Sequence, residues 1–158
     1  MKKIAVFVLA LVLVFAFSAC GNSAKATQLG DSDFSVVLPE GFEIEEDKFD
    51  EDQIAFYYKD KSSIDFDVYL WEKGDQYELV SEAEYFASEY GAVPEAVTVN
   101  GIEGMKYVTE EEFNGYVYTV VNYMFEDDTY IVELSFWTID TAEEYAAVDE
   151  IINTLKKN

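Results

Sequence analysis

Apolar and polar residues alternate along much of the chain from residue 33 onwards, which is typical of β-strands with one buried face. The clearest strand is 64–71, in which two sets of side chains would face opposite ways: Ile64, Phe66, Val68 and Leu70, against Asp65, Asp67, Tyr69 and Trp71. Residues 116–125 are apolar on both faces, which predicts a central strand covered on both sides. Further strands are predicted at 34–38, 42–46, 53–58, 96–99, 102–108 and 129–137. Asn100-Gly101 and Asn114-Gly115 predict tight hairpin turns between strands.

Two segments show helical spacing instead. Ser81 and Glu84 would form a capping box for a helix over 81–90, which Gly91 would end. Thr141 and Glu144 would form a second capping box. It precedes an apolar stripe of Tyr145, Val148, Ile152 and Leu155, with Lys156 and Lys157 at the negative end of the helix dipole.

These elements predict an α+β domain, in which an antiparallel sheet of six to eight strands packs with two α-helices. Their order resembles the PsbP-like fold as it occurs in bacterial lipoproteins. The residues that carry this resemblance are Phe34–Phe42, Val99–Met105, Tyr130–Phe136 and a terminal helix that ends Ile151–Leu155. The resemblance spans most of residues 33–156 and includes no catalytic motif, so it implies a fold and no activity.

The N-terminal segment has the three parts of a cleaved export signal. Lys2 and Lys3 precede an uncharged apolar stretch, Ile4–Phe17. At about 1.5 Å per residue, this stretch is shorter than the ~30 Å hydrocarbon core of a bilayer. The sequence Phe17-Ser18-Ala19-Cys20 then resembles the lipobox of bacterial lipoproteins, although Leu is more usual where Phe17 stands. The resemblance implies cleavage before Cys20 and attachment of diacylglycerol to its sulfur. A secretory signal cut after Ala19 or Ala24 and a retained membrane helix are the alternatives.

We therefore expect a signal peptide over 1–19 and the lipidated Cys20 with a flexible tether over 20–32. A single α+β domain would follow over 33–158. Residues 21–31 are small and polar, as in flexible linkers. Two acyl chains anchor a protein stably, so the expected location is the extracytoplasmic face of a bacterial cell membrane.

The charge restricts the possible partners. The chain has 33 acidic residues, ten Lys and Arg together, no His and a formal net charge of −23. Such a field repels phosphate backbones, so we expect no nucleic-acid partner. All ten basic residues are lysines, so the His-dependent triads, the usual metal ligands and an arginine phosphate clamp are missing. Once Cys20 is acylated, no free thiol remains. We predict no catalytic, cofactor or metal site.

Two weak candidates remain. Asp65 and Asp67 lie on one face of their strand and, with Asp47, Asp50 or Asp52, would suit Ca²⁺. On the same strand, Tyr69 and Trp71 would form an exposed aromatic platform with Trp137, unless a helix covers that face.

The sequence predicts a non-catalytic binding or interaction module whose ligand is a protein, a cation or a glycan. A carboxylate-dependent hydrolase of cell-wall or extracellular polymer and a Ca²⁺-responsive adhesin are the alternatives.

Overall fold

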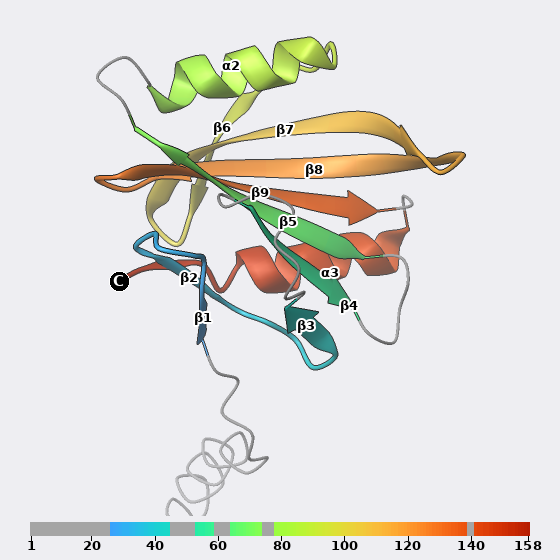
Figure 1. The fold of residues 1–158 in the computed structure, drawn as a ribbon, viewed down its shortest axis with the longest axis horizontal. Helices are drawn as coiled ribbons and strands as arrows, with labels where there is room; N and C mark the ends of the chain where they lie inside the picture. Colours follow the sequence, from blue (N-terminus) through green and yellow to red (C-terminus); the bar gives the residue numbers. More distant parts are fainter. Residues whose placement is uncertain (1–25, 45–52, 59–63, 74–77, 139–140) are drawn as a thin grey trace, which may run out of the picture.

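The computed structural model describes residues 26–44, 53–58, 64–73, 78–138 and 141–158. Within these residues the chain forms two antiparallel sheets and two helices (Figure 1). The larger sheet has seven strands, in the order β3 (Phe42–Ile44), β4 (Gln53–Tyr58), β5 (Asp65–Glu72), β9 (Tyr130–Thr138), β8 (Tyr116–Glu126), β7 (Ile102–Phe113) and β6 (Glu95–Val99). The smaller has three, in the order β1 (Ala26–Gln28), β2 (Phe34–Val37) and β10 (Lys156–Lys157). The predicted α+β class is confirmed.

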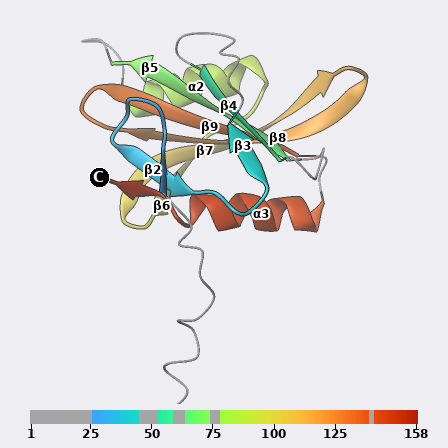
Figure 2. The same cartoon turned by 60° about the horizontal axis from the view of Figure 1, so that its bottom comes forward.

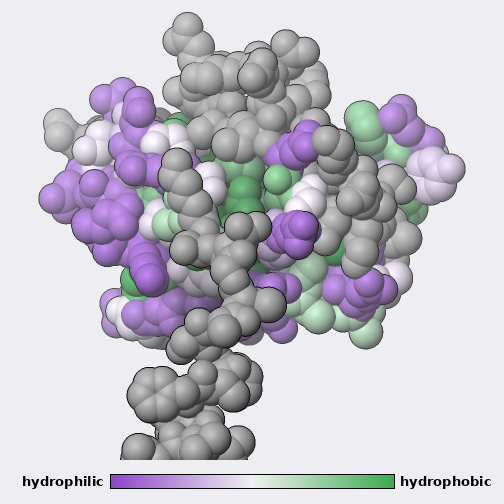
Figure 3. Space-filling model, turned by 90° about the horizontal axis from the view of Figure 1, so that it is seen from below, coloured by the Kyte–Doolittle hydropathy of each residue, from purple (hydrophilic) through white to green (hydrophobic). Residues whose placement is uncertain are grey.

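The helices lie on opposite faces of the seven-stranded sheet (Figures 1 and 2). Helix α3 (Ala142–Ile152) and the small sheet pack on one face, which we call the α3 face. Helix α2 (Leu79–Glu89) packs on the other, the α2 face, mainly against β7 and β8. Seen from the α3 side, many of the described surface residues are hydrophilic, as the acidic composition requires (Figure 3).

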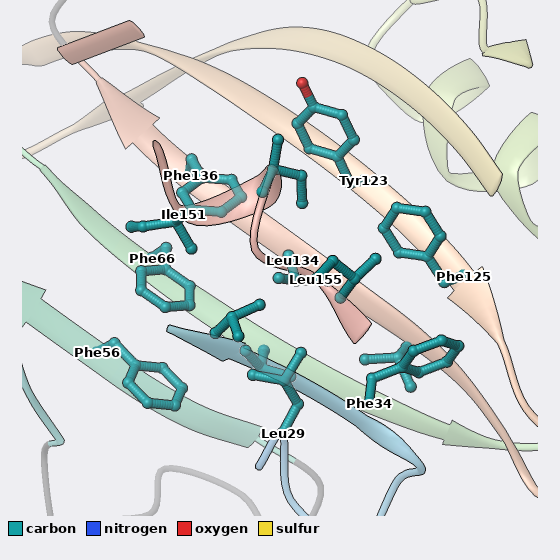
Figure 4. Close-up of a cluster of buried hydrophobic side chains, with 14 of the residues drawn as sticks. Leu29, Phe34, Phe56, Phe66, Tyr123, Phe125, Leu134, Phe136, Ile151 and Leu155 are labelled. Carbon is teal, nitrogen blue, oxygen red and sulfur yellow. The ribbon is translucent and has the colours of Figure 1, made fainter. Parts of the chain in front are cut away.

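The α3 face contains the main hydrophobic core (Figure 4). Phe66 of β5 is fully buried between the rings of Phe56 and Phe136, whose centroids lie 4.6 and 4.9 Å from its own. Ile151 of α3 and Leu155 belong to the same core (Figure 4). Full burial of each large side chain contributes about 1.5–3 kcal/mol before the entropy of ordering is subtracted.

Both predicted hairpins are confirmed. Asn100 and Gly101 have φ values of 52° and 84°, and Asn114 and Gly115 have values of 53° and 81°. Positive φ at both central residues defines the type I′ turn, which matches the right-handed twist of the strands. The turns place β7 between β6 and β8, and the buried half of β8, Val120–Phe125, lies between β7 and β9 as expected.

Gly104 of β7 shows why a side chain is missing inside a long strand. A Cβ atom there would lie 2.5 Å from Cδ1 of Phe125 and 2.6 Å from the carbonyl oxygen of Met124. Phe125 is directly opposite Gly104 in the strand register, and its ring occupies the space over the glycine. A bare backbone at this position therefore lets a large aromatic side chain pack into the core.

The two predicted capping boxes had different outcomes. At α3 the box is present: the Thr141 hydroxyl accepts from the Glu144 backbone N–H, and the Glu144 carboxylate accepts from the Thr141 N–H. At α2 the prediction was wrong, because the helix begins at Leu79 and Ser81 lies inside it. Leu79 packs with the cluster under α2, so tertiary contact favours the earlier start. The end of α2 was predicted correctly, since Gly91 follows with φ +70°.

Two further boundaries differ from the expectation. Helix α3 ends at Ile152 rather than Leu155, and Lys156–Lys157 form β10 against β2 instead of completing a helix. The expected tether over 20–32 is too long, because β1 pairs with β2 and Leu29 is fully buried. Strand pairing uses the backbone, so small polar residues can join a sheet without an apolar pattern. Cys20 and the signal segment lie outside the described residues.

Candidate functional site

The α2 face differs from the core because its strands carry polar and aromatic side chains. Strand register brings these side chains together: Tyr69 of β5 lies opposite Glu133 of β9, and Asp67 lies opposite Ser135. Asn122 of β8 lies opposite Ser135 on one side and opposite Tyr107 of β7 on the other. Because side chains alternate between the two faces, all of these point towards α2 and away from the core.

These side chains line a pocket of about 140 Å³ on the α2 face. Strands β5, β7, β8 and β9 form its floor, and the C-terminal half of α2 forms one side. Its aromatic lining consists of Tyr69, Trp71, Phe86, Tyr90, Tyr107 and Trp137, and the other lining residues are Glu111, Val120, Asn122, Glu133 and Ser135. We refer to it as the α2-face pocket.

Glu133 is the carboxyl group at the floor of the α2-face pocket, and only 5% of the residue is exposed. The Tyr107 hydroxyl donates a hydrogen bond to Oε1, and the indole N–H of Trp71 donates to Oε2 at 3.4 Å. Burial raises the pKa of Glu133, and these two hydrogen bonds lower it only in part. Among the described residues that line the pocket, none carries a positive charge.

The pKa values of other ionisable groups around the pocket are also raised. Burial raises the pKa of Glu111, and the hydrogen bond from Thr109 offsets only part of that. Burial also raises the pKa values of Tyr69 and Tyr107, and nearby carboxylates raise them further. The pKa of Tyr90 is raised first by the charge of Glu111. The charges that contribute to these shifts belong to carboxylates, so the ionised carboxylates give the pocket a negative potential in addition to the effect of burial.

The predicted aromatic platform is present in part. Tyr69 and Trp71 stack with centroids 6.0 Å apart, and Trp71 also contacts Phe86 of α2 at 5.2 Å. Helix α2 thus lies over one end of the platform, although Trp71 remains 39% exposed. Trp137 is half-buried at the other end, where its indole N–H donates to Oδ2 of Asp67 at 3.1 Å. Helix α2 therefore covers only part of the platform, and the α2-face pocket lies beside the helix.

The described residues leave the predicted calcium site untested. Asp65 is exposed and Asp67 accepts the Trp137 hydrogen bond, while Asp47, Asp50 and Asp52 lie outside the described residues. No group of three or more His, Cys, Asp or Glu suited to a metal ion occurs within the described ranges. Calcium binding by the acidic loops stays a prediction.

Two larger cavities are weaker candidates for a binding site. One of about 690 Å³ lies between α2 and β6–β7, and its lining includes the Lys73–Glu126 ion pair at 3.0 Å. Its wall is formed in part by Lys73 and Glu78, which border the segment 74–77 outside the described residues. The other, of about 540 Å³, lies on the far side of the Trp71–Phe86 contact. Neither contains a buried carboxyl group, so the α2-face pocket is the better candidate.

Sequence reasoning missed Glu133 as a site residue. A pattern in the sequence could have revealed it, because Glu133 is the one charged residue in the mostly apolar run Tyr130-Ile-Val-Glu-Leu-Ser-Phe136. Residues 131–136 are all buried, because both faces of β9 are covered. A carboxyl group inside such a strand has no access to bulk water, so it needs partners within the fold.

Comparison with known proteins adds information about the fold. No known family pattern matches the chain, and no curated protein matches it in sequence. Among solved structures, cyanobacterial PsbP (CyanoP) from Synechocystis sp. PCC 6803 is similar over 90% of this chain and 99% of its own, with 12% identity and a TM-score of 0.64. The fold is PsbP-like.

Two other solved structures are similar. A Bacteroides thetaiotaomicron protein matches over 79% of this PsbP-like chain with 19% identity and a TM-score of 0.60, but over only 45% of its own length. LpqN of Mycobacterium tuberculosis, involved in cell envelope biogenesis, matches over 86% of both chains with 12% identity and a TM-score of 0.49. At these identities the likeness concerns the fold alone. Within the described residues, no helix has the length and apolar character needed to cross a membrane.

Proposed function

We propose that this PsbP-like protein is a membrane-anchored extracytoplasmic lipoprotein whose domain acts as a non-catalytic binding module. The observation that carries the binding role is the α2-face pocket, an aromatic-lined hollow with a buried carboxyl group at its floor. Preformed, concave sites of this kind, with few polar groups among apolar ones, are typical of ligand binding.

The state of Glu133 favours binding over catalysis. Each of its oxygens already accepts a hydrogen bond from Tyr107 or Trp71, which fixes the carboxyl group in place. Polar groups that are held in one orientation in this way position a ligand in a binding site. The chain also has no His to exchange protons near neutral pH.

The anchor is inferred from Cys20 and from the length of chain that follows it. The first strand begins at Ala26, so five residues, 21–25, connect the lipidated cysteine to the folded domain. Even fully extended, such a linker spans at most about 18 Å. The proposed anchor would therefore hold the acidic domain close to the head groups, and anionic lipids would repel it.

Replacing Cys20 with Ala in cells tests the anchor. We expect wild-type protein in the membrane fraction, with an N-terminal mass that includes diacylglycerol, and Cys20→Ala protein without that mass and released from the membrane. Ser18→Thr serves as a matched control, since it leaves the cysteine intact. Retention of unmodified Cys20→Ala protein in the membrane would contradict the proposal.

One observation favours the alternative of a carboxylate-dependent hydrolase. Two carboxyl groups with raised pKa values, Glu133 and Glu111, border the same pocket. A hydrolytic pair requires one protonated and one ionised group, whereas burial shifts both of these upwards. Turnover of a peptidoglycan or polysaccharide preparation by full-length protein, abolished by Glu111→Gln, would replace our proposal with the hydrolase.

A further inference from the structure

The α2-face pocket has the features of a site for a small positively charged ligand. A cation is attracted to the faces of Trp, Tyr and Phe rings through the ring quadrupole, most strongly where water is excluded. Tyr69 and Trp71 stack side by side along β5, and Phe86 of α2 contacts Trp71 at 5.2 Å. Trp137 lines the pocket from β9. Aromatic side chains thus surround the pocket from the sheet and from the helix.

Charge is the second argument. An ionised carboxylate buried to the extent of Glu133 is costly without a positive partner. Tyr107 and Trp71 each donate one hydrogen bond to the carboxylate of Glu133, but both donors are neutral. The described residues that line the pocket supply no cation, so burial favours the protonated carboxyl group, and a bound cation would favour the ionised form instead.

Size is the third argument. The pocket volume of about 140 Å³ is too small for a drug-sized molecule, which occupies roughly 300 Å³ or more. It is similar to the cavity of about 150 Å³ that accommodates a benzene molecule in an engineered protein. A head group with a few methyl groups around one nitrogen fits such a space, whereas a sugar chain or a peptide does not.

We propose that the α2-face pocket binds an alkylammonium group, with its aromatic side chains around the methyl groups and the Glu133 carboxylate facing the positive nitrogen. This inference rests on the proposed binding function and names its ligand class. The cation makes electrostatic contacts with the ring faces and needs no hydrogen-bond donor of its own. Because carboxylates repel anions, the pocket excludes phosphate and carboxylate ligands.

Ligand affinity is coupled to the protonation of Glu133. The ionisable groups that interact with it are Tyr107 and Glu111 on β7, Tyr69 on β5 and Tyr90 at the end of α2, and Asp67 acts on Tyr69 from the same strand. The tyrosines stay neutral because their pKa values are raised, so the carboxyl groups titrate first. A proton on Glu133 removes the charge that attracts the ligand, and affinity therefore falls as the pH is lowered.

The two tryptophans of the chain provide the readout, because both Trp71 and Trp137 line this pocket. Full-length protein in a non-ionic detergent is titrated with choline and with dimethylbutanol, its neutral carbon analogue, while tryptophan fluorescence and heat are recorded. We expect saturable binding of choline and at least about tenfold weaker binding of dimethylbutanol. Affinity for choline should fall when the pH is lowered from about 9 to about 5.

Three variants localise the binding. Glu133→Gln should weaken choline binding about tenfold and reduce its pH dependence to the part that Glu111 contributes. Phe86→Leu, which keeps an apolar side chain without a ring face, should weaken binding about fivefold. Glu110→Gln is the matched control, since it removes the same charge from an exposed position on the other face of β7 and should leave affinity unchanged. Urea unfolding of each variant establishes that it is folded.

The source of the group is distinguished with phosphatidylcholine vesicles. The ligand is a lipid head group if vesicles bind the wild-type protein but not Glu133→Gln, and if free choline binds more weakly than the vesicles do. If free choline binds more strongly than the vesicles, the ligand is a solute. Equal binding of choline and dimethylbutanol, equal losses in Glu110→Gln and Glu133→Gln, or no binding of choline would overturn the ligand assignment. None of these results bears on the proposed lipid anchor, which the fractionation of Cys20→Ala tests separately.

Discussion

The two faces of the seven-stranded sheet are built from alternate residues of the same strands, yet they have different roles. On the α3 face, β5 and β9 contribute Phe66 and Phe136 to a dry, stacked aromatic core. Three residues further along β5 and three residues back along β9, the α2 face carries the half-buried Tyr69 and the buried Glu133. The larger hydrophobic cluster lies on the α3 face, so that face supplies most of the packing energy and the α2 face can contain a buried carboxyl group.

The largest expected effect is on the α3 face. Phe66→Ala removes a fully buried ring from between Phe56 and Phe136 and should lower the free energy of unfolding by about 3–5 kcal/mol. The matched change on the α2 face, Phe86→Ala, affects a half-buried ring and should cost about 1–2 kcal/mol. Urea unfolding curves of both variants check the difference. Equal losses would show that the two faces contribute alike.

A smaller effect is expected from the hydroxyl group of Tyr107. Tyr107→Phe leaves the buried Glu133 oxygen without its donor and should cost about 1.5–3 kcal/mol, as for hydrogen bonds to charged groups. Tyr123→Phe is the control, because Tyr123 is buried on the α3 face, where its ring packs with Phe125 and Phe136. Its loss should be below about 1 kcal/mol. A larger loss for Tyr123→Phe would reverse the assignment.

The pH dependence of stability also separates the two faces. The pKa of Glu133 is raised in the folded protein above its ordinary value of 4.5, so the folded state holds this proton more tightly than the unfolded chain. As the pH rises from 4.5 through the folded pKa, Glu133 therefore lowers stability, by at most about 1.4 kcal/mol per pH unit. In Glu133→Gln this loss should be absent, and unfolding in urea at several pH values measures it. An unchanged slope would mean that Glu133 does not titrate differently on folding.

The smallest effects distinguish the two helices. Thr141→Ala removes an observed N-cap of α3 and should cost about 1 kcal/mol. Ser81→Ala should change stability by less than about 0.5 kcal/mol, because α2 begins before Ser81 and no side chain caps it. Thermal unfolding of the two variants is sufficient. A loss at Ser81 as large as that at Thr141 would indicate that the serine contributes as a cap after all.

How far the sequence could predict the site depended on the kind of residue. The platform on the α2 face followed from the alternation of β5, which placed Tyr69 and Trp71 on the same side. Glu133 was not identified, because the acidic residue in an apolar run indicates a buried site only when both faces of β9 are recognised as covered. The start of α2 also depended on tertiary contacts. Ser81 and Glu84 satisfied the local capping pattern, but the packing of Leu79 against the cluster under α2 favoured an earlier start of the helix.

The sequence by itself determined the strands from β2 to β9, the two type I′ turns, the N-terminal cap of α3 and the α+β class, because these depend on alternation and on local backbone geometry. Only the tertiary structure decided that β1 joins the domain and that Lys156–Lys157 pair with β2, since such pairings join backbone groups far apart in the chain. It also decided the α2-face pocket, in which strand register brings Glu133, Tyr107 and Trp71 from three separate strands into contact. Local pattern fixes the register within a hairpin but not between strands that are far apart in the chain, such as β5 and β9, and that pairing places Glu133 among the aromatic rings.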